Sequence, residues 1–168
     1  EEWVTRSDCE AIHSAYDNGD FENEIKLCSG MFASSIYDAN EDSVILLRDR
    51  VGQKPLYYSI VNNETLIFSS SLKAIISSGI VNATLDQENL KFILFNEYPP
   101  VGYSGIKKIY SVKPSEIINW KIGTKKIEKF IYWKWTLGTN ELETKPTYYP
   151  MKEQIFSDLN ASVKEELI

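Results

Sequence analysis

The stretch Arg48-Asp49-Arg50-Val51-Gly52-Gln53-Lys54-Pro55-Leu56-Tyr57-Tyr58 decides the local fold of this chain. It follows a run of Val, Ile and Leu at 44–47 and returns to strand-forming residues after the proline. The pattern predicts a buried strand, a sharp charged turn and a second strand. Upstream, Ser29-Gly30-Met31-Phe32-Ala33 opens another strand, expected over 31–37. Because this strand is nearly free of charge, we expect it inside a sheet that is covered on both faces.

Further elements follow from caps, turns and periodicity. Helices are predicted from Ser7 to the stop at Asn18-Gly19, and over 22–27, 71–78 and 86–97, the last with Leu90, Ile93 and Leu94 buried. Hairpins are predicted at Asn62-Asn63, between strands 55–60 and 64–68, and at Gly123-Thr124, between strands 117–122 and 126–132. Hairpins with helices grouped on a face indicate an α+β domain.

Composition limits the classes of function. The 168 residues carry 18 basic and 24 acidic side chains, a net charge of −6, which argues against nucleic-acid and anionic-membrane surfaces. No apolar run approaches the roughly 18 residues that span a bilayer. Cys9 and Cys28 lack the spacing of a zinc site, and no metal site is expected. We expect a cytoplasmic protein.

Ser7-Asp8-Cys9-Glu10 has the lettering of a capping box, in which Ser7 accepts from Glu10 and Glu10 reaches back to Ser7. Asp8 then lies in the first turn of a helix, where the helix dipole favours a carboxylate. An anion held there can bind the ammonium group of a ligand. The alternative is a solvated carboxylate at a helix start.

The charged turn is expected to be structural. One glycine followed by proline lacks the run of free backbone N–H groups that cradles a phosphate. An aspartate between two arginines at a strand end predicts a buried ion-pair bracket that fixes the turn. The residues assigned to this structural role are Arg48, Asp49, Arg50, Gly52, Lys54 and Pro55.

The order Gly30-Met31-Phe32-Ala33, then Tyr37-Asp38, then the 48–58 stretch resembles the glutaminase half of glutamine-hydrolysing asparagine synthetases, which are class II glutamine amidotransferases. The resemblance implies the four-layer αββα fold of amino-terminal-nucleophile hydrolases, with two packed antiparallel sheets and outer helices. The chain departs from the family at Ser71, where the family usually has glutamate, and at Ser34-Ser35, where it commonly has Phe-Ala.

The resemblance also assigns site residues. Asp8 would contact the α-amino group of substrate glutamine, with Ser7 and Glu10 in support. The family's nucleophile is a cysteine at the first position, whose own α-amine is the base. Neither Cys9 nor Cys28 is that residue. We therefore expect no catalytic residue in this chain and no activity from it alone.

By the same resemblance, residues 1–135 are the later part of a glutaminase domain, 136–147 a linker, and 148–168 the truncated first helix of a synthetase domain. The chain looks cut at both ends, and we expect an internal fragment that lacks the nucleophile and the ATP loop. The whole protein would transfer ammonia from glutamine to aspartate that is activated by ATP and magnesium. No cofactor is expected within these residues, and a homodimer is compatible with the resemblance.

Two alternatives stay open. One is a non-hydrolytic module that keeps the glutaminase fold as a structural part of an ATP-dependent amide ligase. The other is an amidotransferase with a different acceptor.

Overall fold

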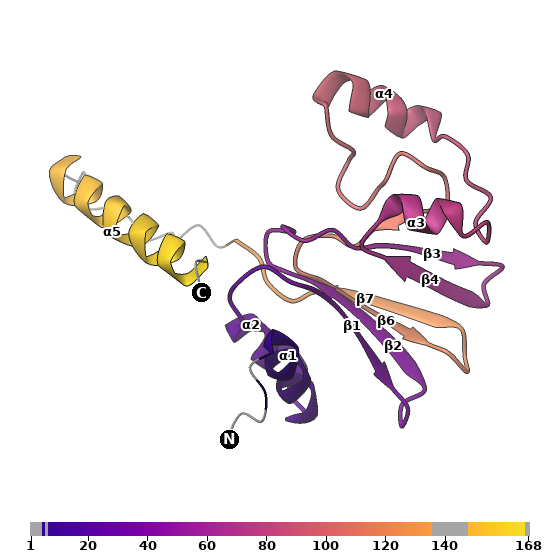
Figure 1. Ribbon diagram of the computed structural model, residues 1–168, viewed down its shortest axis with the longest axis horizontal. Helices are drawn as coiled ribbons and strands as arrows, with labels where there is room; N and C mark the ends of the chain where they lie inside the picture. Colours follow the sequence, from indigo (N-terminus) through magenta and orange to yellow (C-terminus); the bar gives the residue numbers. More distant parts are fainter. Residues whose placement is uncertain (1–4, 6, 136–147, 167–168) are drawn as a thin grey trace. The chain divides into compact units, whose positions relative to one another are not determined.

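Two antiparallel sheets form the main part of the chain (Figure 1). Sheet A has the strand order β1 (Ala33–Asp38), β2 (Ser43–Arg48), β6 (Glu116–Lys121) and β7 (Lys126–Ile131). Sheet B has the order β4 (Thr65–Ser69), β3 (Tyr57–Val61) and β5 (Tyr110–Ser111). This computed structural model describes residues 5, 7–135 and 148–166, and the chain divides into the units Glu1–Lys134 and Trp135–Ile168.

The helices of the first unit are α1 (Asp8–Asp17), α2 (Phe21–Leu27), α3 (Leu72–Ser77) and α4 (Gln87–Asn96). Three apolar clusters fill the spaces between its layers. One joins α1 and α2 to sheet A through Ile12, Ile25, Ile45, Leu47, Ile117 and Tyr132. The second lies between the sheets and contains Leu46, Leu56, Tyr58, Val112 and Ile118. The third, under α3, contains Ile75, Val81 and Ile109. The predicted four-layer α+β arrangement is confirmed.

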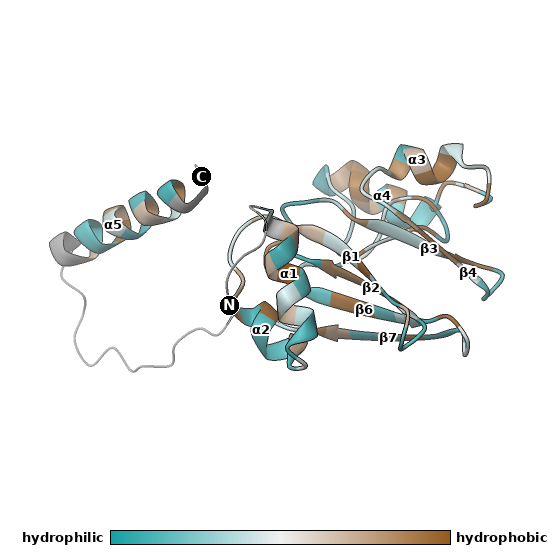
Figure 2. Cartoon of the chain, turned by 60° about the horizontal axis from the view of Figure 1, so that its bottom comes forward, coloured by the Kyte–Doolittle hydropathy of each residue, from teal (hydrophilic) through white to brown (hydrophobic). Residues whose placement is uncertain are grey.

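The middle strands of sheet A are buried on both faces. Leu46 belongs to the cluster between the sheets and its neighbour Leu47 to the cluster under the helices. Ile118 and Ile117 on β6 divide in the same way, because side chains alternate across a strand. Figure 2 shows the resulting apolar colouring along β2 and β6.

The strand β1 differs from its prediction. It is the outer strand of sheet A among the described residues, and Tyr37 is 65% exposed. The expectation of cover on both faces was therefore wrong. Residues 31–37 carry no charge, but burial alternates along β1, and the side chains of Ser35 and Tyr37 are exposed to solvent.

Both predicted hairpins are confirmed. Asn62 and Asn63 have φ values of 53° and 61°, in the left-handed region that asparagine tolerates, and they join β3 to β4. The second hairpin pairs Lys121 with Lys126 across the turn that contains Gly123 and Thr124.

Helix α4 begins and ends as predicted but buries less. The Asp86 carboxylate accepts hydrogen bonds from the backbone of Glu88 and Asn89, and Glu97 closes the helix with φ 65°. However, no residue of α4 is buried, and Leu94 is 75% exposed. The predicted buried face is therefore wrong, since Leu90 and Ile93 are only half-buried and Leu94 is exposed.

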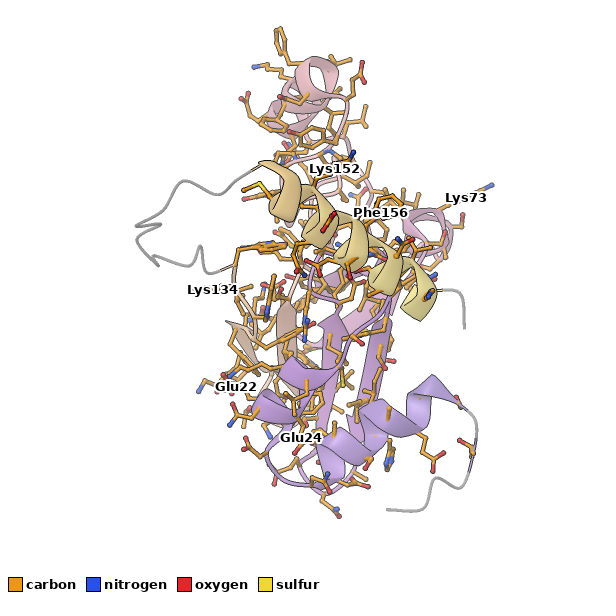
Figure 3. The ribbon with its side chains drawn as sticks, turned by 90° about the vertical axis from the view of Figure 1, so that its left-hand side faces the viewer. Glu22, Glu24, Lys73, Lys134, Lys152 and Phe156 are labelled. Atoms are coloured by element: carbon orange, nitrogen blue, oxygen red, sulfur yellow. The ribbon has the colours of Figure 1, made fainter. Side chains whose placement is uncertain are left out.

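The second unit contains α5 (Tyr148–Glu166). Its apolar side chains Ile155, Leu159 and Val163 are all exposed. Lys152 and Phe156, labelled in Figure 3, line a shallow groove on this helix together with Met151, Ile155 and Leu159. No helix within 148–166 or the other described ranges is long and apolar enough to cross a membrane. The predicted linker over 136–147 lies outside the described residues.

Replacing Leu46 by alanine tests the packing between the sheets. Leu46 is fully buried, so Leu46→Ala should lower the free energy of unfolding by about 2–5 kcal/mol. Leu94→Ala, the matched control on the exposed side of α4, should change it by less than about 0.5 kcal/mol. Equilibrium denaturation of both variants gives the comparison, and equal losses would contradict this placement of the core.

Candidate functional site: the start of α1 and the charged turn

A network of side chains caps the start of α1. Ser7 is the N-cap, and its hydroxyl accepts a hydrogen bond from the backbone N–H of Cys9 at 3.3 Å. The Glu10 carboxylate accepts from the backbone N–H of Thr5 at 2.6 Å and from the Thr5 hydroxyl. Ser7 therefore caps the helix as predicted, but the capping box does not form. Glu10 bonds to Thr5, two residues further back than expected.

Asp8 is the first residue of α1. Its side chain lies outside the described residues, so its role as an amine-binding carboxylate stays a prediction. Helix α1, which carries Asp8, is capped by Ser7 at its start and is bonded to β1 through Tyr16 at its far end.

The far end of α1 is tied to sheet A. The Tyr16 hydroxyl donates a hydrogen bond to the Asp38 carboxylate on β1 at 2.6 Å. Burial, followed by this hydrogen bond to an anion, raises the pKa of Tyr16 to about 12. The same hydrogen bond is the main cause that lowers the pKa of Asp38, with the backbone N–H groups of Glu41 and Asn40 adding to it. Helix α1 is therefore held against β1 at neutral pH.

The Asp49 carboxylate organises the charged turn from inside. Asp49 is 1% exposed. Its Oδ1 accepts from the backbone N–H groups of Val51 at 3.2 Å and Gln53 at 2.9 Å, and its Oδ2 accepts from Lys54 at 3.0 Å. The predicted ion-pair bracket is thus not the interaction that forms. The backbone folds around the carboxylate, and the salt bridges found among the described residues do not include Asp49.

The Arg48 side chain ties the turn to the segment before β6. It donates to the carbonyl oxygens of Lys54 and Gly52, both at 2.6 Å, to that of Val112 at 2.7 Å, and to the Ser111 hydroxyl at 3.0 Å. Burial lowers the pKa of Arg48, although a guanidinium stays charged in proteins. Its four bonds go to neutral acceptors, so this side chain clamps the backbone.

Gly52 is required in this turn. Its φ is +73°, and a Cβ added there would lie 2.9 Å from Pro114 Cγ and 3.1 Å from Arg48 Cζ. Both the backbone conformation and the close neighbours therefore exclude a side chain. Pro55, further along the turn, is exposed. It follows Lys54, whose backbone N–H donates to the Asp49 carboxylate and whose C=O accepts from the Arg48 side chain.

Arg50 points to the helical side of sheet A. It donates to the carbonyl oxygen of Lys26 at the end of α2, and its guanidinium lies 5.6 Å from the Trp133 ring centroid. The Ser115 hydroxyl donates to the Arg50 carbonyl oxygen at 2.8 Å. Arg48 and Arg50 thus brace opposite sides of one turn, each through backbone carbonyls.

Two residues of this network escaped the sequence analysis. The Tyr132 hydroxyl donates to the Arg48 carbonyl oxygen at 2.9 Å, and the Ser115 backbone N–H donates to that of Asp49 at 3.0 Å. Burial raises the pKa of Tyr132. Nothing in the local sequence signals either contact, because both partners lie more than sixty residues away along the chain.

The two cysteines differ in their surroundings. Cys28 is half-buried, and burial raises the pKa of its thiol, which disfavours the reactive thiolate. Cys9 is exposed at the start of α1. Within the described ranges, no three His, Cys, Asp or Glu side chains gather closely enough to hold a metal ion.

Comparison with known proteins agrees with this architecture. The family model described as the glutamine amidotransferase domain matches residues 1–133. The chain therefore belongs to the glutamine amidotransferase domain family.

The relatives are considerably longer proteins. A protein of Methanocaldococcus jannaschii, provisionally named asparagine synthetase (glutamine-hydrolysing) 2, is 29% identical over 135 residues, 79% of this chain and 26% of the relative. Asparagine synthetase (glutamine-hydrolysing) 2 of Bacillus subtilis is 43% identical over 75 residues, 44% of this chain and 10% of the relative. Amidase chyE of Penicillium rubens is 33% identical over 79 residues, 47% of this chain and 12% of the relative. The chain spans about a quarter of the first relative's length and about a tenth of the second's.

Removing the buried carboxylate tests whether it organises the turn. Asp49→Ala leaves three backbone N–H groups without their acceptor and should cost on the order of 3 kcal/mol of unfolding free energy. Asp49→Asn keeps one acceptor oxygen and should lose less. Glu64→Ala, at an exposed position of the β3–β4 turn, should stay within about 0.5 kcal/mol. Chemical denaturation distinguishes these variants, and an Asp49→Ala loss as small as that of Glu64→Ala would remove Asp49 from this role.

The Tyr16–Asp38 hydrogen bond should make stability depend on pH. Because folding lowers the pKa of Asp38, this stabilisation is present above about pH 4 and is lost as the pH falls through the folded-state pKa. Tyr16→Phe should therefore be less stable than the parent at pH 7, and the difference should shrink in acid. Tyr37→Phe is the matched control because Tyr37 is exposed on the same strand. A Tyr16→Phe deficit that is equal at pH 7 and pH 2.5 would show that the bond contributes no pH dependence.

Proposed function

We propose that the chain is part of an asparagine synthase that hydrolyses glutamine and transfers the ammonia to ATP-activated aspartate. The observation that carries the proposal is the family match over 1–133, together with relatives named as glutamine-hydrolysing asparagine synthetases. In this proposal residues 1–135 frame the glutamine pocket, residues 136–147 form a linker, and α5 begins the synthetase domain.

The proposed role of these residues in catalysis is substrate positioning. A carboxylate at Asp8 would bind the α-ammonium of glutamine at the positive end of α1, and Ser7 would fix the direction of the first turn. The nucleophile would be a first-residue cysteine of the whole protein, which neither Cys9 nor Cys28 is. We therefore expect no ammonia release from this chain alone. ATP and magnesium would act in the synthetase domain.

The amino-terminal-nucleophile reaction explains why the frame must be rigid. A thiol attacks the side-chain amide of glutamine only when the substrate is held in line, and small displacements cost large factors in rate. The α1 anchor through Tyr16 and the closed hydrogen-bond network of the charged turn supply that rigidity here. A cytoplasmic location fits this biosynthetic role.

A different acceptor is the second candidate. The Penicillium rubens relative is named an amidase, so this domain also occurs in a protein with another printed name. A non-hydrolytic module is the third. It is favoured by Ser71, whose hydroxyl caps α3 by accepting from the backbone N–H of Ala74 at 3.4 Å, where the resembled family usually has glutamate.

Asp8→Asn in the full-length protein tests the proposed glutamine site. The substitution keeps the size of the side chain but removes its charge, so glutamine-dependent synthesis should weaken mainly through KM, by about 1.5–3 kcal/mol. Synthesis from added ammonium should persist, because it bypasses the glutamine pocket. Parallel loss of both activities would assign Asp8 to folding, and no change in either would return it to the solvated alternative. Product analysis with aspartate as acceptor decides between the first two candidate functions.

A further inference from the structure

The Thr5 side chain lies at the centre of the hydrogen bonds in front of α1. Its hydroxyl donates to the Glu10 carboxylate and accepts from the backbone N–H of Ser7 at 3.2 Å. The same carboxylate accepts from the backbone N–H of Thr5 at 2.6 Å. Together these three bonds form the Thr5 latch, which joins the chain before the helix both to the N-cap residue and to the first turn.

The backbone on both sides of Asp8 takes part in this arrangement. The Ser7 hydroxyl accepts from the backbone N–H of Cys9 at 3.3 Å, and the Ser7 carbonyl oxygen accepts from the backbone N–H of Glu10 at 3.0 Å. Asp8, the first residue of α1, is therefore flanked in the chain by two bonded residues. When the backbone is fixed in this way, the position of an aspartate carboxylate depends on χ1 and χ2 alone.

The Thr5 latch goes beyond what a helix cap requires. An N-cap side chain accepts from free N–H groups of the first turn, and Ser7 already does so at Cys9. The donors of the latch are Thr5 and Ser7, which both precede the helix, so its bonds fix how the chain enters α1. Thr5 itself is exposed. Hydrogen bonds to a carboxylate are stronger than neutral ones, which suits them to order an exposed segment.

We propose that Thr5 is a positioning residue for substrate binding, which acts through Ser7 and Glu10 to hold the Asp8 carboxylate toward the α-ammonium of glutamine. This role rests on the proposed glutamine site and adds to it a residue outside the 7–10 motif. A carboxylate that is already aimed loses little conformational freedom when the substrate binds. Because the reaction takes place at the other end of the substrate, the latch affects KM more than kcat.

The experiment measures glutamate release from glutamine by the full-length protein. Thr5→Val removes the hydroxyl but keeps the size of the side chain, so KM for glutamine should rise about fivefold while kcat stays within about twofold. Thr5→Ser restores the hydroxyl and should return KM close to the parent value. Thr65→Val is the matched control, because Thr65 is an exposed threonine at the start of β4, and its KM should equal that of the parent.

A double variant distinguishes positioning from a general effect on stability. If Thr5 acts through Asp8, Thr5→Val should not raise KM further in the Asp8→Asn background, because the charge that the latch aims has been removed. Two independent effects would instead multiply in KM. Glu10→Gln is a second variant that weakens the latch, since it removes the charge of the acceptor, and it should raise KM with the same dependence on Asp8.

Each failure has its own signature. An unchanged KM in Thr5→Val and Glu10→Gln, with KM raised in Asp8→Asn, would overturn the role of Thr5 and leave the glutamine site standing. An unchanged KM in Asp8→Asn would remove the glutamine contact, and the role of Thr5 with it. A rise in Thr5→Val that Thr5→Ser does not reverse, or that multiplies with Asp8→Asn, would assign Thr5 to folding of the helix start alone.

Discussion

The buried Asp49 carboxylate is the interaction on which the first unit depends most. Three backbone N–H groups of one turn converge on it, and the two neighbouring arginines bind carbonyl oxygens instead of the carboxylate. An anion in the interior is tolerated only when hydrogen bonds satisfy it. The turn therefore has one conformation, which requires Gly52, and β2 and β3 leave it in fixed directions.

The same turn also connects separate layers. The Asp49 backbone N–H donates to the carbonyl oxygen of Phe32, next to β1. The Ser115 backbone N–H, next to β6, donates to the carbonyl oxygen of Asp49. Arg50 reaches the end of α2, and Arg48 reaches Val112, which belongs to the cluster between the sheets. One polar centre thus links segments beside β1, β6 and α2 to the cluster between the sheets.

The sequence predicted those features whose causes are local. The Asn62-Asn63 turn and the Asp86 cap depend on a few neighbouring residues, and both form as expected. The exposure of Tyr37 and Leu94 depends on which layer lies opposite, which periodicity cannot reveal. The partners of Asp49 were mistaken for the same reason, since sequence adjacency suggested the arginines, whereas the folded backbone brought its own donors closer.

The charged turn and the start of α1 differ in whether their polar groups are already engaged in internal hydrogen bonds. In the charged turn, the Asp49 carboxylate and the Arg48 guanidinium are already engaged by backbone groups, so binding a ligand there would break internal hydrogen bonds. The start of α1 is different. The Ser7 hydroxyl accepts from the Cys9 N–H and the Ser7 carbonyl from the Glu10 N–H, and the positive end of the helix dipole acts on a charge placed there. The Tyr16 hydroxyl bonds the far end of the same helix to Asp38 on β1. A supported helix start is what a substrate-positioning site requires, so our proposal places binding at α1 and scaffolding at the turn.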